Sequence, residues 1–384
     1  MFSRARILGT GRTPFSKASG RSVLSLALEA TEGACRDAGI DARDLDGVIT
    51  YAIDDSIYST SVLNALGCPD IRWFADFNGG GNQFLTSLLQ AAMVVEHGLA
   101  ERVVVFRAIN GRSESRLGGS SKSIAARGGM QYTAPVGWTT YGRFDAMMAR
   151  RHMEIYGTTT DHLGGVAVAA REWAVANPNA TMRKPLSLED YNQSPMISDP
   201  FRLLDYCQEF DCAFAVVIGA AGTSATPARE IEFVSGVLGG GPRPGGDHWG
   251  YIEWAEHAKT FSHFLKQRLY GPAGLRSSDI DLLYLYDCFT FSVLGQLEGF
   301  GFAKPGESGA LVASGATGPG GHVPVNTHGG LLSEGYGHGM NNFVEAVLQL
   351  RKEAGDRQLP RADRALVTGG ATTTGCAIVL GAAA

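Results

Sequence analysis

Two clusters of polar side chains in the second half of the chain are candidates for chemistry. Tyr286 and Asp287 stand at the end of the apolar run 282–286, a predicted strand, and strand ends are where α/β proteins often display functional side chains. The glycine-rich segment 326–342 comes just before a predicted amphipathic helix, Phe343–Leu350, and glycine lets such a loop close around a ligand at a helix N-terminus. The titratable side chains of this segment are His328, Glu334, Tyr336 and His338.

Each of these residues, taken singly, has an ordinary structural alternative. A tyrosine at a strand end is more often a core residue, and a lone histidine more often fills a hydrogen-bonding role. Tyrosine, histidine, glutamate and asparagine gathered in one loop favour a functional site. We expect no metal, because the spacing of His328, Glu334 and His338 does not match a helical His-x-x-x-His arrangement.

A glycine-rich turn at Asn78–Gly81 lacks the nucleophile that such a turn commonly presents. The turn follows an apolar segment and opens a predicted helix, Phe84–Ala92. The unpaired N–H groups and the positive dipole at a helix N-terminus would stabilise a thiolate at this position. Because glycine has no side chain, we expect Gly81 and Asn82 to form a pocket for an anion or a carbonyl oxygen instead.

The sequence contains an internal repeat, which predicts the architecture. Ala38–Asp46 aligns without a gap on Ala273–Asp281, and each copy ends a helical pattern with glycine before an apolar strand. Ala215–Ala220 matches Ala377–Ala382 at a smaller offset, so the first copy carries extra sequence. Strands that alternate with helices in both halves predict a duplicated α/β fold with buried sheets. The expected boundaries are 1–225, with an insertion at about 107–212, and 226–384.

The start of the predicted insertion is rich in basic residues. Between residues 107 and 151 there are eight basic and two acidic side chains, although the net charge of the chain is -5. A ligand with several phosphates, such as coenzyme A, would be attracted to this segment. Solvated arginines on helix faces are an equally good interpretation. The candidate ligands for the phosphates of coenzyme A are Arg112, Arg116, Lys122 and Arg127.

The composition disfavours several classes of protein. A chain of 384 residues with 44% apolar and 18% charged residues is typical of a soluble globular protein of two-domain size. No apolar stretch is long enough for a membrane span, and the absence of a polybasic tract disfavours nucleic acid as a partner. The six cysteines include no Cys-x-x-Cys pair and are interpreted as reduced, mostly buried thiols. We therefore expect a cytoplasmic protein.

Taken in order, these motifs resemble the thiolase superfamily over essentially the whole chain. The resemblance rests on the duplicated α/β plan, the Asn78–Gly81 turn, Tyr286–Phe289, the segment 326–342 and the closing strand Gly369–Leu380. Within the superfamily, the chain is similar to the lipid-transfer-protein branch related to the thiolase domain of sterol carrier protein X. The resemblance implies a five-layer αβαβα fold with two central mixed sheets.

All four thiolase catalytic groups are replaced in this sequence. The acylated cysteine falls on Gly81, the asparagine of the Asn-Glu-Ala-Phe motif on Tyr286, and the histidine of the Gly-His-Pro motif on Tyr336. The second cysteine falls on Val367. A covalent acyl-enzyme needs a thiolate and a base, so thiolase chemistry is not expected. The pattern is similar to that of the steroid side-chain aldolases, which cleave a β-hydroxyacyl-CoA by retro-aldol reaction.

The resemblance implies an acyl-CoA aldolase, a carbon–carbon lyase that acts on a bulky substrate such as a steroid side chain. Tyr286 and Tyr336 would be the acid and the base in an undetermined order, and His338 would lower a tyrosine pKa or bind the thioester oxygen. Asp287 is a further catalytic candidate. His328 and Glu334 would line the pocket. Two alternatives remain open: an acyltransferase that uses Cys288 or Cys376, and a non-catalytic carrier of acyl-CoA or lipid.

The resemblance also implies an assembly. Thiolase-like subunits pair through the edges of their first-half sheets, and Arg102–Phe106 is the expected edge strand. A homodimer would bind two copies of an OB-fold and zinc-ribbon partner, giving a heterotetramer. The chain itself is expected to need no cofactor beyond the coenzyme A thioester, its substrate, and zinc is expected only in the partner.

Overall fold

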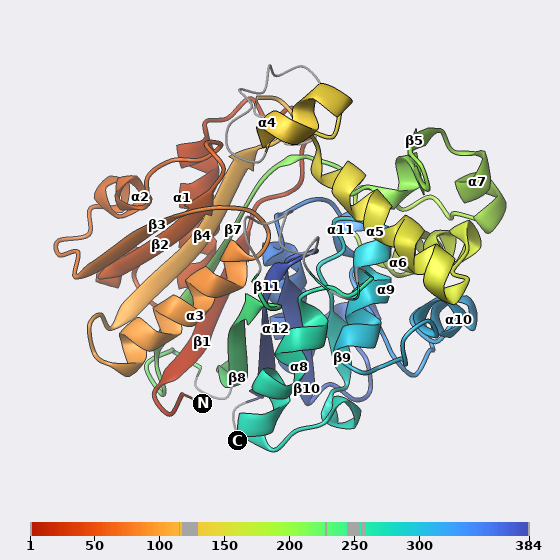
Figure 1. The fold of residues 1–384 in the computed structure, drawn as a ribbon. Helices are drawn as coiled ribbons and strands as arrows, with labels where there is room; N and C mark the ends of the chain where they lie inside the picture. Colours follow the sequence, from red (N-terminus) through yellow and green to blue (C-terminus); the bar gives the residue numbers. More distant parts are fainter. Residues whose placement is uncertain are drawn as a thin grey trace.

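A mixed sheet of nine strands runs through the part of the chain that the structure describes. The computed structural model describes residues 2–114, 116, 130–226, 229–243, 254, 256 and 258–382. The strand order is β3-β2-β4-β7-β1-β8-β11-β10-β9, with the first five strands from the first half and the last four from the second (Figure 1). The strands are β1 Ala5–Arg12, β2 Gly47–Ala52, β3 Trp73–Asn78, β4 Arg102–Asn110, β7 Asp211–Ala220, β8 Ile231–Gly240, β9 Leu282–Tyr284, β10 Arg364–Gly369 and β11 Thr374–Ala382.

The two half-sheets are continuous, where we expected two separate sheets. They meet at β1 and β8, which pair through only two residue pairs, Arg6 with Glu232 and Ile7 with Ile231. By contrast, β1 pairs with β7 along most of its length. This short β1–β8 pairing joins the sheets of the two halves into one sheet. The predicted edge strand is wrong, because β4 lies in the sheet interior between β2 and β7, and β3 forms the edge.

Helices cover both faces of the sheet, as expected for strands that are apolar on both sides (Figure 1). The helices α1 and α2 pack on one face of the first half, whereas α3 and α12 contact strands of both halves. The helix α8 packs on β8 and β11. Their bounds are α1 Val23–Ala38, α2 Ser59–Leu66, α3 Gln83–Glu96, α8 Ser262–Tyr270, α9 Thr290–Gly299, α10 Ser308–Ala313, α11 Gly330–Ser333 and α12 Met340–Leu350.

The repeated sequence motif is also a structural repeat. Gly39 and Gly274 both end a helical segment in the left-handed conformation, with φ of 68° and 64°. Asp46 then accepts hydrogen bonds from two backbone N–H groups at the start of β4, and Asp281 accepts the equivalent pair at the start of β10. Each aspartate thus ties a strand to its parallel neighbour. The same residues perform the same task in both halves, which supports the internal duplication.

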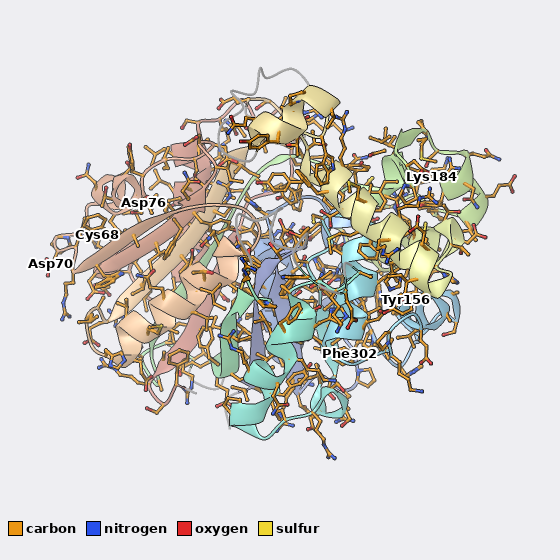
Figure 2. All side chains as sticks on the ribbon, in the orientation of Figure 1. Cys68, Asp70, Asp76, Tyr156, Lys184 and Phe302 are labelled. Carbon is orange, nitrogen blue, oxygen red and sulfur yellow. The ribbon has the colours of Figure 1, made fainter. Side chains whose placement is uncertain are left out.

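Two helices of the segment between the adjacent antiparallel strands β4 and β7, at residues 141–156 and 160–175, pack against helices α9, α10 and α11 of the second half (Figure 1). Trp173 Nε1 donates a hydrogen bond of 3.0 Å to the carbonyl of Thr317. Figure 2 shows Tyr156 and Lys184 of this segment on the opposite side of the molecule from Asp76 in β3. Its elements are α4 Met130–Thr133, α5 Tyr141–Tyr156, α6 Thr160–Val175, α7 Leu188–Gln193, β5 Met196–Ser198 and β6 Phe201–Arg202. Among the described residues, no helix combines the length and the apolar character needed to cross a bilayer.

Candidate active site

Two tyrosines from different parts of the second half meet in the interior of the protein. Tyr286 follows β9 by two residues, and Tyr336 lies in the loop between α11 and α12. Their hydroxyl oxygens are 3.0 Å apart, a hydrogen-bond distance, and both side chains are buried. Burial raises the pKa of Tyr286 and of Tyr336 well above the usual 10. Both side chains are therefore neutral phenols at neutral pH.

The ring of Tyr286 occupies the space that Gly81 leaves empty. A Cβ at position 81 would lie 2.1 Å from Cζ of Tyr286 and 2.2 Å from its hydroxyl oxygen. Phe84, in the first turn of α3, stacks on the same ring with a centroid separation of 6.3 Å. A side chain at position 81 and a tyrosine at position 286 therefore exclude each other.

Hydrogen bonds from two neighbouring elements hold the backbone of Tyr286. Its N–H donates to Oγ1 of Thr368 in β10 at 2.9 Å. Its carbonyl accepts from Oγ of Ser292 at 2.8 Å and from Nε2 of Gln296 at 3.0 Å, both in α9. All three partners are buried. The position of the phenol is thus set by the core and not by a mobile surface loop.

The chain just before β7 braces both tyrosine-bearing segments. The carbonyl of Gln208 accepts a hydrogen bond of 3.0 Å from the N–H of Tyr336. One residue earlier, the N–H of Cys207 donates to the carbonyl of Cys288 at 3.1 Å. The thiol of Cys212 lies 3.7 Å from the carbonyl of Tyr336, to which it donates. These bonds link the segment that carries Tyr286 to the loop that carries Tyr336.

His338 lies beside the pair as a neutral imidazole. Its ring centroid is 5.1 Å from that of Tyr336. Nε of Arg107 donates to its Nδ1 at 3.0 Å, and Arg107 is also paired with Asp55 at 2.6 Å. Burial, and then the charge of Arg107, lower the pKa of His338 well below 6.5. A neutral ring brings no positive charge, so His338 does not lower a tyrosine pKa through its charge, and burial raises the pKa of both tyrosines.

The two alternative thiols are poorly suited to nucleophilic attack. Cys376 is buried and donates a hydrogen bond of 2.8 Å to the carbonyl of Asn82. Burial raises the pKa of Cys376, and it raises the pKa of Cys288 well above the usual value. Because the thiolate is the reactive form, neither residue supplies a nucleophile at neutral pH.

Comparison with known proteins agrees with this geometry. Residues 263–382 match the family described as thiolase C-terminal domain-like. A steroid side-chain-cleaving aldolase from Thermomonospora curvata is 37% identical over 98% of each chain. A 17-hydroxy-3-oxo-4-pregnene-20-carboxyl-CoA lyase from Mycobacterium tuberculosis is 36% identical over 98% of this chain and 99% of its own. This chain belongs to the thiolase superfamily.

A solved structure supports the same assignment. The Ltp2-ChsH2(DUF35) aldolase has a TM-score of 0.90 at 37% identity, and the match covers 99% of this chain and 98% of that one. The family resemblance and the expected class of enzyme are thus confirmed. The chain is a carbon–carbon lyase of the superfamily.

In this lyase, Asp287 supports the loop that carries Tyr336. Its carboxylate accepts hydrogen bonds from the N–H groups of Leu331 and Leu332, at 3.0 and 3.2 Å, at the start of α11. Burial raises the pKa of Asp287 despite these bonds. A Cβ at Gly330 would lie 2.0 Å from this carboxylate, so the close approach requires glycine. The structure therefore places Asp287 in a bracing position.

Glu334 and His328 belong to a buried network beside the same loop. Glu334 accepts from Nη1 of Arg12 at 2.8 Å and from Nδ2 of Asn341 at 2.9 Å, and His328 Nε2 lies 3.1 Å from Oδ1 of Asn342. Burial alone would raise the pKa of Glu334, but Arg12, His328 and the hydrogen bonds outweigh it and lower that pKa. The network holds an ionised carboxylate in the core. Among the described residues, no group of three or more His, Cys, Asp or Glu side chains could hold a metal ion.

The candidate ligands for coenzyme A phosphates are only partly described. Arg112 is exposed, and Arg116 forms an ion pair of 3.1 Å with Glu209. Lys122 and Arg127 lie outside the described residues. Arg107, which the sequence grouped with these basic residues, is instead buried beside His338. Its place in the middle of β4, with apolar residues on both sides, was the signal that could have separated Arg107 from the others.

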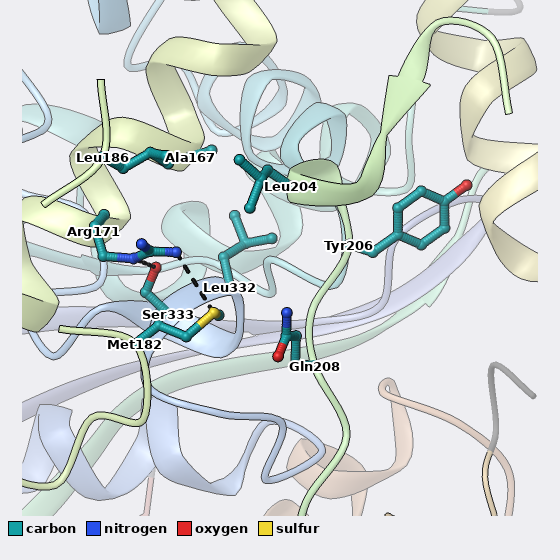
Figure 3. A pocket seen from close by; sticks show the side chains of 9 residues that line it. All are labelled: Ala167, Arg171, Met182, Leu186, Leu204, Tyr206, Gln208, Leu332 and Ser333. Atoms are coloured by element: carbon teal, nitrogen blue, oxygen red, sulfur yellow. Dashed lines mark hydrogen bonds between the residues drawn. The ribbon is translucent and has the colours of Figure 1, made fainter. Parts of the chain in front are cut away.

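A narrow depression lies beside the loop of Tyr336 (Figure 3). Nε of Arg171 donates to Oγ of Ser333 at 3.1 Å, and Nη2 donates to the sulfur of Met182 at 3.5 Å. The depression has no room for even a water molecule, and neither Tyr286 nor Tyr336 lines it. It is lined by Ala167, Arg171, Met182, Leu186, Leu204, Tyr206, Gln208, Leu332 and Ser333.

Proposed function

We propose that this chain is the catalytic subunit of an acyl-CoA aldolase that shortens the side chain of a steroid. The substrate would be a β-hydroxyacyl-CoA, and the products a ketone and a shorter acyl-CoA. The observation that carries the proposal is the 3.0 Å contact between the hydroxyls of Tyr286 and Tyr336 in the space left by Gly81. The steroid-cleaving relatives from Thermomonospora curvata and Mycobacterium tuberculosis support the substrate class.

The hydrogen-bonded phenols suit a retro-aldol reaction because they can transfer a proton without forming a free phenolate. In this reaction the β-hydroxyl loses its proton, the Cα–Cβ bond breaks, and the resulting enolate takes up a proton at Cα. One tyrosine would accept the hydroxyl proton while it passes its own to the second tyrosine, which protonates Cα. The raised pKa of each buried phenol disfavours a free phenolate, so a concerted relay is the favourable route.

The acyltransferase and carrier alternatives fit the site less well. An acyltransferase needs a thiolate, and burial raises the pKa of both Cys288 and Cys376. A silent carrier would not need two hydroxyls in contact, because burying polar groups costs free energy that an apolar lining avoids. The tyrosine pair therefore favours catalysis.

We propose a homodimer formed through β3. Its residues alternate between half-buried and exposed, and Phe74 is 61% exposed. The opposite edge, β9, is covered, since Leu283 donates to the carbonyl of Pro324 and accepts from the N–H of Asn326. Among the described strands, none pairs with the outer side of β3. An uncovered edge with an exposed aromatic side chain is suited to pairing with a second copy.

We further propose a partner of the DUF35 type, with an OB-fold and a zinc ribbon, giving a heterotetramer of two copies of each chain. The Ltp2-ChsH2(DUF35) aldolase supports a partner of the DUF35 type. In this assembly the chain alone would have little activity.

One experiment tests the function and the assembly together. The purified chain, alone and with its candidate partner, is incubated with 17-hydroxy-3-oxo-4-pregnene-20-carboxyl-CoA, and the products are separated by mass spectrometry. We expect a ketosteroid and a shortened acyl-CoA from the mixture. If the folded complex cleaves neither this substrate nor any other β-hydroxyacyl-CoA, the proposed aldolase activity is refuted. Light scattering on the same samples would refute the assembly if the chain alone is a monomer, or a fully active dimer that ignores its partner.

A further inference from the structure

Arg107 is a charged residue in the middle of a buried strand. The residues of β4 from Val103 to Asn110 are all buried, and only 1% of the Arg107 side chain is exposed. Its guanidinium forms an ion pair of 2.6 Å with Asp55, whose other oxygen accepts from the N–H of Ile53 at 2.9 Å. Burying a charged pair costs free energy unless the geometry is well satisfied, so such a pair often serves more than stability.

The second bond of Arg107 determines where the proton of His338 lies. Arginine can only donate, so Nδ1 of His338, 3.0 Å from Nε of Arg107, must be an unprotonated acceptor. A neutral imidazole with a bare Nδ1 carries its proton on Nε2. Among the described residues, only Arg107 is hydrogen-bonded to this ring. The Nε2–H group is therefore left for a ligand.

The surroundings of His338 hold its ring in place and keep it uncharged. The hydroxyl of Tyr51 donates to the carbonyl of His338 at 2.9 Å, and the rings of Tyr51 and Tyr336 lie 5.3 and 5.1 Å from the imidazole. The charged groups that face it are Arg107 in β4 and, behind Arg107, Asp55. Protonation of Nδ1 would place a second cation against the guanidinium.

We propose that Arg107 is a positioning residue that fixes His338 as its neutral Nε2–H tautomer, and that this N–H donates to the thioester oxygen as the enolate forms. The inference rests on the proposed function, because a retro-aldol step develops negative charge on that oxygen. A donor held ready where charge develops stabilises the transition state more than the bound substrate. His338 would thereby supply the hydrogen bond, while the tyrosine pair moves the proton.

The test uses the full chain in complex with its partner and three variants. Arg107→Met removes the bond to His338, and Arg107→Lys keeps a cationic donor. Arg357→Met is the matched control, because Arg357 is also buried and pairs with Glu345 at 2.8 Å, and none of its hydrogen bonds within the described residues goes to Tyr286, Tyr336 or His338. Nitrogen-15 spectra of the histidines report the tautomer and titration of His338, whose signal is identified by its loss in His338→Gln.

We expect His338 of the wild-type complex to keep its proton on Nε2 without titrating between pH 5.5 and 8, a range that brackets its ordinary pKa of about 6.5. In Arg107→Met, the proton of His338 should no longer be fixed on Nε2, and its pKa should rise while burial still holds it below the ordinary value. Because the donor is then less well held, kcat should fall by up to about 100-fold with little change in KM. Arg107→Lys should recover part of the lost kcat. The control should keep both the kcat and the His338 spectrum of the wild type.

Several results would overturn the inference. One is a wild-type His338 that carries its proton on Nδ1 or that titrates near its ordinary pKa. This measurement is made on the wild type, so it tests the inference even if Arg107→Met does not fold. Another is a folded Arg107→Met complex with wild-type kcat. If the tyrosine variants are inactive while Arg107→Met is fully active, the aldolase stands and only this inference fails. If the wild type cleaves no substrate, the proposed function fails, and the role of His338 as a donor fails with it.

Discussion

Replacing Gly81 by alanine tests directly whether the space above Tyr286 determines activity. The added Cβ would lie 2.1 Å from Cζ of Tyr286, whereas ordinary contacts begin at 3.4 Å, so the ring must move by about 1.3 Å. A shift of that size separates the two phenol oxygens from their 3.0 Å contact. Since a misplacement of about 1 Å can cost roughly 100-fold in rate, we expect kcat/KM to fall by about 100-fold or more. Overpacking should also lower the free energy of unfolding by about 1–3 kcal/mol.

The neighbouring glycine provides a matched control. A Cβ at Gly80 would meet only Cδ1 of Ile53, at 3.9 Å, and neither Gly80 nor Gly81 has a positive φ. Gly80→Ala should therefore keep wild-type activity and stability. Both variants are assayed for ketone release from a β-hydroxyacyl-CoA in the presence of the partner, and their unfolding is followed by denaturant titration. A Gly81→Ala complex with wild-type kcat/KM would refute the claim that the empty position is needed for the tyrosine pair.

Three further outcomes follow from the same site. Tyr286→Phe and Tyr336→Phe should each lower kcat about 100- to 10,000-fold while the fold and acyl-CoA affinity persist, and near-full activity of either would remove that tyrosine from the mechanism. Replacing all six cysteines by serine or alanine should leave ketone release intact, whereas a loss traced to one thiol in a folded variant would favour an acyltransferase. Because burial lowers the pKa of His338, its contribution to stability is present above about pH 6.5 and is lost as the pH falls below it. In denaturant titrations, the free energy of unfolding should therefore fall less between pH 7.5 and pH 5 for His338→Gln than for the wild type. Equal decreases in the two proteins would contradict this linkage.

Much of the fold could be predicted from local sequence because the duplication leaves the same signals in both halves. A glycine that ends a helix, followed by an aspartate that binds the start of the next strand, occurs at Gly39 with Asp46 and again at Gly274 with Asp281. Strand order is not encoded in such local signals. The misassigned edge strand illustrates this, because Arg102–Phe106 is apolar in the way that both interior and edge strands can be, and its neighbours are settled only by tertiary pairing.

The sequence predicts site residues whose type is unexpected for the family. It does not predict the roles that depend on which side chains are in contact. Tyr286 and Tyr336 stood out because they replace groups that thiolase chemistry requires, and the structure places their hydroxyls in contact. Asp287 stood out equally, yet its carboxylate binds the start of α11. Arg107 was missed because it was grouped with the other basic residues of its segment, although it lies in a buried strand.

The exchange at positions 81 and 286 explains how the thiolase fold can serve a reaction without a covalent intermediate. A nucleophile on the turn before α3 would need the space that the Tyr286 ring fills, so gaining the tyrosine and losing the side chain at position 81 amount to one steric change. The second phenol then reaches the first from the loop between α11 and α12, at a position carried by the same glycine-rich segment as His338. Burial keeps both phenols protonated and the imidazole neutral. A site with no resident charge on these three groups cannot attack a thioester, but it can pass a proton along a hydrogen-bonded pair while a neutral N–H stabilises the enolate.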